Sequence, residues 1–178
     1  MNIAHEIVMP KYEYQKEDGR SYSVSFKELN DRDKVLALEA MMKQEPQVEI
    51  PVFHYFSRGV YAREIHIPAG TLLTGEIHKF ENLNILSKGD ISVMTDDGVK
   101  RVQAPFTIVS PPGTKRIALA HTDCIWTTIH GTFLKDVDKI KKIFIAETEE
   151  EYLEHCKRLE LIATVAKDSK NPILKDFY

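Results

Sequence analysis

The chain has no long apolar run and few cysteines. No segment of its 178 residues reaches the roughly 20 apolar residues that a membrane-spanning helix needs. The first twenty residues also lack the apolar centre of a signal peptide. Cys124 and Cys156 are too few for a disulfide framework, which agrees with a reducing compartment. The sequence therefore predicts a cytoplasmic protein that has no part in a membrane.

Concentrated positive charge and several catalytic motifs are missing as well. The formal net charge is -3, and the longest basic run is KIKK at residues 139–142. Binding to a phosphate backbone normally needs a concentrated basic face, so no nucleic-acid partner is expected. The sequence has no glycine-rich phosphate loop, no Cys-x-x-Cys pair and no nucleophile elbow. With 43% hydrophobic and 29% charged residues, its composition is that of an ordinary globular domain.

The distribution of residue types predicts three regions. Residues 1–47 form an N-terminal extension, residues 48–132 a β-rich domain and residues 133–178 a C-terminal extension. In the first region Ser25 and Glu28 have capping-box spacing ahead of a helical pattern that ends at Pro46. In the last region Thr148 and Glu151 have the same spacing ahead of EEYLEHCKRLEL, which predicts a second helix.

The middle region consists of short β-branched runs separated by turn residues, among them DISVMTDDG, VKRVQAP and FTIVSPPG. Asp97-Gly98 between two of these runs is a strong signal for a two-residue hairpin. Short strands at regular spacing, without helices between them, predict an antiparallel sandwich or barrel.

Two stretches of this region resemble the motifs of the cupin family. The first, GEIHKFENLNILSKG at residues 75–89, follows a Pro-Ala-Gly-Thr turn that begins at Pro68. The second, PPGTKR at residues 111–116, matches the Pro-x-Gly start of the other cupin motif. The resemblance covers about half of the chain. It implies an all-β core folded as a double-stranded β-helix, a jelly-roll barrel, with an N-terminal helix and a C-terminal helical extension.

The same resemblance assigns four positions of this chain to the family's metal ligands. These positions are Glu76, His78, Asn82 and Arg116, and only His78 keeps the family's residue type. An arginine has no lone pair to offer a cation and stays protonated. The standard metal site is therefore not expected, and no cofactor is favoured.

Another use of these four residues follows from the cost of burying charge. A glutamate and an arginine inside a barrel are stabilised most simply by pairing, so a Glu76–Arg116 salt bridge is expected. The arginine fork also suits a carboxylate or phosphate, with His78 and Asn82 as further hydrogen-bonding groups. The alternatives are purely structural: a packed barrel histidine, a structural ion pair, and asparagines that satisfy strand ends.

A divalent transition metal remains a second interpretation. Glu76 and His78 would then bind it together with a histidine from another strand, either His66 or His130. His121 is discounted because strict alternation from Arg116 points it outward. Each of the other two histidines alone is also consistent with an ordinary hydrogen-bonded sheet residue.

The segments GTLLTGEIHK, SPPGTKR and WTTIHG are similar to short cupin-like proteins of bacteriophage and bacterial genomes, most of which have no assigned activity. A phage-encoded protein would work in the host cytoplasm. Because cupin barrels commonly pair sheet to sheet, the resemblance also implies a homodimer.

Three functions are consistent with these residues. The first is a binding module whose pocket holds a small anionic, sugar-like or nucleotide-like ligand without a metal, for example to sequester a host metabolite or signal. The second is an enzyme, either metal-dependent, as in a dioxygenase, or an isomerase or epimerase with His78 as general base. The third is a structural protein that uses the barrel as a scaffold. The first is preferred, and the sequence does not decide whether any reaction is catalysed.

Overall fold

The computed structural model describes residues 11–15, 21–25, 31–95 and 98–168. The chain divides into two compact units, Met1–Glu49 with Asp96–Gly98 and Ile50–Thr95 with Val99–Tyr178. Among the described residues, no helix combines the length and the apolar character needed to cross a bilayer.

The first unit contains a hairpin and a helix. Strands β1 (Lys11–Gln15) and β2 (Ser21–Ser25) pair antiparallel, and helix α1 spans Asp31–Met42. The predicted N-terminal helix is confirmed, but its predicted start at Ser25 is wrong because Ser25 is the last residue of β2. The two-residue alternation in SYSVS favours this strand. Glu28, the other half of the predicted capping box, lies outside the described residues.

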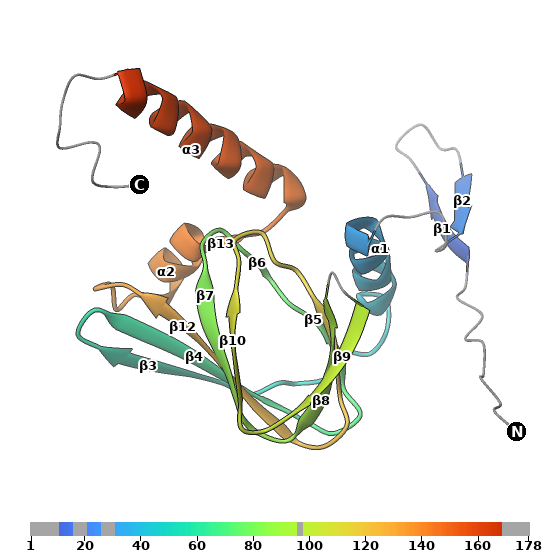
Figure 1. The fold of residues 1–178 in the computed structure, drawn as a ribbon. Coiled ribbons are helices and arrows are strands. Elements are labelled where there is room, and N and C mark those ends of the chain that lie inside the picture. The colour runs from blue at the N-terminus through green and yellow to red at the C-terminus, as the bar shows by residue number, and fades with distance from the viewer. Residues whose placement is uncertain (1–10, 16–20, 26–30, 96–97, 169–178) are drawn as a thin grey trace, which may run out of the picture. The chain divides into compact units, whose positions relative to one another are not determined.

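The second unit is built on two antiparallel sheets (Figure 1). The five-stranded sheet has the order β10-β7-β12-β4-β3 and the four-stranded sheet the order β5-β11-β8-β9. The first comprises β3 (Val52–Ser57), β4 (Val60–Ile67), β7 (Asn82–Lys88), β10 (Phe106–Ser110) and β12 (Cys124–Gly131). The second comprises β5 (Leu72–Thr74), β8 (Asp90–Thr95), β9 (Gly98–Gln103) and β11 (Ile117–Ala120). The all-β core and the double-stranded β-helix predicted from the sequence are confirmed.

The apolar core fills one end of this barrel. Its buried residues are Ile67, Leu86, Ile91, Val93, Ala120 and Cys124, contributed by both sheets. Strand register then places polar residues on the same inner face further along the strands. The row formed by Ile65, Trp126 and Leu86 is followed by one formed by Arg63, Thr128 and Asn84. Because side chains two apart share a face, the barrel interior changes from apolar to polar along its axis.

The C-terminal extension begins at the polar end. Helix α2 (Val137–Phe144) leads into the short strand β13 (Ile145–Ala146), which pairs with β6 (Ile77–His78), and helix α3 (Glu149–Asp168) follows. Figure 1 shows α2 and the β13–β6 pair at the same end of the barrel. Thr148 Oγ1 accepts the backbone N–H of Glu151 at 3.1 Å, which is the first half of the predicted capping box. The Glu151 carboxylate accepts the N–H of Glu147 instead of that of Thr148.

Candidate functional site

A cavity of about 120 Å³ opens inside the barrel, and its wall combines apolar side chains such as Ile67 and Ile91 with polar ones. All four residues that the sequence singled out line it: Glu76, His78, Asn82 and Arg116. They come from segments that lie far apart in the chain, since the first two flank and enter β6, the third begins β7 and the last precedes β11. The structure therefore gathers them around one space, and their role in ligand binding remains a prediction.

Asn84 on β7 is the centre of a buried polar network in the cavity wall. Its side-chain amide donates to Asn82 Oδ1 at 2.7 Å and to Ser110 Oγ at 3.0 Å. Its carbonyl oxygen accepts from Thr128 Oγ1 at 2.8 Å and from Trp126 Nε1 at 3.2 Å. An asparagine side chain has two donor hydrogens and two acceptor lone pairs, so Asn84 is fully satisfied. The network fixes the polar wall of the cavity in one arrangement.

The architecture agrees with the fold predicted from the sequence. Two antiparallel sheets face each other, and both motif stretches meet at one cavity. The barrel is a two-sheet jelly roll, the fold that the resemblance in the sequence implied. A cupin domain from Bordetella pertussis is 14% identical over 49% of this chain and 98% of its own, with a TM-score of 0.39. A cupin-2 domain protein from Shewanella frigidimarina is 15% identical over 58% of this chain and 100% of its own, with a TM-score of 0.38.

A cupin superfamily protein from Desulfitobacterium hafniense is likewise 11% identical over 49% of this chain and 81% of its own, with a TM-score of 0.41. At these identities the likeness concerns the fold alone. No protein-family model and no curated protein matches the sequence.

The two charged motif residues have different neighbours from those predicted. Instead of the expected Glu76–Arg116 bridge, the structure places Lys141 of α2 with its Nζ 3.4 Å from Glu76 Oε1. The Arg116 guanidinium donates to Ser110 Oγ at 2.8 Å, which connects it to the Asn84 network. Lys141 was not predicted at the site because no local pattern shows that α2 packs against β6.

Arg63 on β4 is a further charged residue of the cavity wall, and the sequence analysis missed it. Its side chain is half-buried, and among the described residues the structure gives it no hydrogen bond or ion pair. The signal for it was alternation in VYAREIHI, which puts Arg63 on the same face as the inward-facing Ile65 and Ile67. A half-buried guanidinium without such a partner among the described residues is available to a ligand.

His78 packs against a second buried histidine, His130 of β12. Their ring centroids are 5.2 Å apart, and His130 also packs on Phe144 of α2 at 4.5 Å. Burial, followed by the nearby Arg63 charge, lowers the pKa of His78 to about 4. Burial, followed by His78, lowers the pKa of His130 to about 4. Both imidazoles are therefore neutral at neutral pH.

Of the histidines considered for a relocated metal site, His130 lies against His78, whereas His66 and His121 point away from the cavity. His66 lies on the opposite face of β4 from Arg63 and Ile65, with its Nε2 2.9 Å from Glu64 Oε1. His121 is exposed, as expected, and its Nε2 is 2.7 Å from Ser92 Oγ. Within the described part of the chain, no group of three histidine, cysteine or acidic residues is arranged to hold a metal ion. The donor set around this cavity, with two arginines in its wall, does not fit a divalent cation.

Proposed function

We propose that the cupin barrel binds a small anionic organic molecule in its cavity without a metal ion. The observation that carries this proposal is the pair of arginines in the wall. Arg63 has no hydrogen-bonding partner among the described residues, and Arg116 is anchored through Ser110. A guanidinium presents several N–H donors in a fixed planar fork that matches a carboxylate or a phosphate group.

The charge balance of the cavity supports an anion. Glu76 is the acidic residue of the wall, and Lys141 lies close enough to neutralise it. His78 adds no charge at neutral pH because its pKa is lowered to about 4. The positive charge of Arg63 therefore has no acidic partner among the described residues of the cavity wall, and the negative charge of a ligand would balance it.

The size of the cavity limits the part of a ligand that it can enclose. Its volume is about 120 Å³, whereas a dry protein cavity of roughly 150 Å³ accommodates benzene. A short carboxylic acid or a phosphate group therefore fits inside, and a whole nucleotide does not.

The same residues favour binding over acid–base catalysis. A general base is most effective when its pKa lies near the working pH. The pKa of His78 is about 4, so this imidazole is a weak base at neutral pH. Asn82 and Ser110 are neutral hydrogen-bonding groups of the wall, which can contact a ligand without transferring protons.

The first experiment is native mass spectrometry of untagged protein purified without added ligand or metal. An organic mass excess supports the proposal and gives the ligand's mass. A mass excess equal to that of a transition metal contradicts the metal-free site. The same spectrum reports whether the protein forms the predicted homodimer.

Calorimetric titration with acetate, succinate and phosphate then tests the arginines. Arg63→Gln should weaken binding of the anion that binds best by about 10- to 100-fold, the usual effect of losing a charged hydrogen bond. Arg158→Gln on the exposed surface of α3 is the matched control and should leave affinity unchanged. Equal affinities for wild type and Arg63→Gln would contradict the proposal.

A further inference from the structure

A second, larger cavity lies between the polar end of the barrel and helix α2. Its volume is about 260 Å³. The barrel contributes His54, Tyr61 and His130, and the helix contributes Val137, Ile140 and Phe144. The lining therefore combines apolar side chains with hydrogen-bonding groups. This mixture is typical of sites for organic molecules.

The two cavities are neighbours that share part of their walls. Arg63, Glu76, His78 and Thr128 line both of them. Because these residues are common to both, a molecule held by Arg63 at the boundary has space on either side. The charged pair of Glu76 and Lys141 also lies at the second cavity, and its two charges offset each other.

The second cavity presents flat aromatic surfaces. His130 packs between His78 and Phe144, with ring centroids 5.2 Å and 4.5 Å away. The Nδ1 atoms of His78 and His130 are buried and have no hydrogen-bond partner in the described part of the chain. Neutral imidazoles and a phenyl ring pack well against another planar ring. The volume of this cavity exceeds the roughly 150 Å³ that accommodates benzene.

We infer that the two cavities hold two parts of one ligand, an aromatic or heteroaromatic carboxylate. Its carboxylate lies at Arg63 and Arg116 in the smaller cavity. Its ring occupies the larger cavity, against Phe144 and His130 and beneath α2. This inference rests on the proposed function, because it takes the anion site as given and assigns the rest of the molecule. It also gives the C-terminal extension a role in selecting the ligand.

Benzoate and acetate are the probes that test this assignment. They share a carboxylate and differ in the ring. Wild-type protein should bind benzoate about 10- to 100-fold more tightly than acetate, because the ring leaves water for an apolar wall. Val137→Trp, at the half-exposed first residue of α2, should fill the larger cavity. It should abolish the preference for benzoate and leave acetate binding intact.

Val165→Trp, at an exposed position of α3, is the matched control and should keep the preference for benzoate. Equal binding of both probes by wild type, or an unchanged preference in Val137→Trp, overturns this inference and leaves the anion site standing. Failure of wild type to bind either probe contradicts the proposed function and this inference together. In every titration, circular dichroism should confirm that the variant is folded.

Discussion

The imidazole rings of His78 and His130 stack inside the polar end of the barrel, with their planes inclined by 22°. They come from strands that do not pair with each other, and β13 and Phe144 lie against them. Two neutral imidazoles in contact are tolerated because neither carries charge. A proton on either ring would have to be accommodated beside its neighbour and close to Arg63.

Acidification should therefore destabilise the protein over a defined range of pH. The pKa of both histidines is about 4 in the folded chain and about 6.5 in the unfolded chain. Between these values the unfolded state binds more protons, so the free energy of unfolding falls as the pH is lowered from about 6.5 to about 4. The loss should be about 2–3 kcal/mol for each histidine. Urea denaturation at pH 7, 6, 5 and 4.5 measures it.

His130→Phe separates this effect from the titration of carboxylates. It removes one of the two buried imidazoles and places another apolar ring next to Phe144. Its acid-induced loss of stability should be smaller than that of wild type by about 2 kcal/mol. His66→Gln, which removes a histidine whose side chain is 41% exposed, should follow the wild-type curve. If His130→Phe also follows it, the buried pair does not govern the acid response.

Asn84 should be the most sensitive neutral residue of the cavity wall. Asn84→Leu removes four hydrogen bonds at once and leaves polar atoms of Asn82, Trp126 and Thr128 without the partner that Asn84 supplied. The expected loss in the free energy of unfolding is about 3 kcal/mol, measured by urea denaturation at pH 7.

The control for Asn84→Leu is Thr127→Val. Thr127 lies on the opposite face of β12, and its hydroxyl bonds to Glu64 at 3.3 Å. Because that bond is long and near the surface, the substitution should cost less than about 1 kcal/mol. Similar losses in the two variants would mean that the network contributes no more than one ordinary hydrogen bond.

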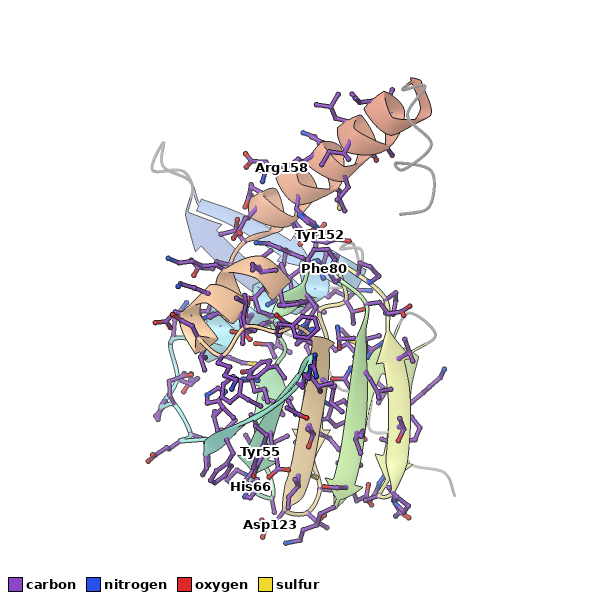
Figure 2. All side chains as sticks on the ribbon, turned by 90° about the vertical axis from the view of Figure 1, so that its left-hand side faces the viewer. Tyr55, His66, Phe80, Asp123, Tyr152 and Arg158 are labelled. Carbon is purple, nitrogen blue, oxygen red and sulfur yellow. The ribbon has the colours of Figure 1, made fainter. Side chains whose placement is uncertain are left out.

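Lys79 and Glu151 form an ion pair, and removing one of them should destabilise the protein more than removing the other. Lys79 Nζ is 2.6 Å from Glu151 Oε1 and 2.9 Å from the backbone oxygen of Lys142. The Lys79 side chain is 9% exposed and that of Glu151 is 42% exposed. Figure 2 shows this region, with Phe80 and Tyr152 near the start of α3 and at the opposite end of the barrel from His66.

Glu151→Ala should lower the melting temperature more than Lys79→Met does. The first change leaves a buried ammonium with less compensation, whereas the second leaves a carboxylate that water can hydrate. Glu150→Ala is the control, because it removes an exposed acid from the same first turn of α3. Thermal unfolding followed by circular dichroism gives the order. The reverse order would mean that Lys79 acts mainly through the packing of its methylene groups.

The sequence predicts the barrel because alternation and turns are local signals. VYAREIHI, NLNILSK and CIWTTIHG alternate along single strands, and the two motifs mark its turns. The same alternation in SYSVS was overlooked in favour of the helical pattern that follows it. The order of strands and the resemblance together were sufficient to predict that Glu76, His78, Asn82 and Arg116 lie around one cavity.

The partners of those residues depend on contacts across long sequence separations. Lys141 reaches Glu76 only because β13 pairs with β6. Each of these strands is two residues long, which is too short to give a recognisable pattern in the sequence. Arg63 could be assigned to the cavity only once its register with Thr128 was known. The bridge between Glu76 and Arg116 was predicted because buried charges need partners. That prediction did not take into account the neighbouring residues that the C-terminal extension supplies.

The glycine that closes the first motif gives the sharpest test of the barrel's backbone. Gly89 joins β7 to β8 with a φ of 101°. A Cβ added there would lie 2.5 Å from Asp123 O and 2.9 Å from Cys124 Cα, which are atoms that cannot move independently of β12. Gly70 has a φ of 79°, and a Cβ there meets nothing within 4 Å.

Gly70→Ala should therefore cost about 1–2 kcal/mol, the usual strain of a left-handed backbone at an L-residue. Gly89→Ala adds a collision with the neighbouring strand, so it should cost more than about 3 kcal/mol or prevent folding. Urea denaturation of both variants and of wild type measures the difference. Equal costs would show that the strands on either side of Gly89 separate easily. The closing glycine would then serve the turn alone and not the close approach of β12.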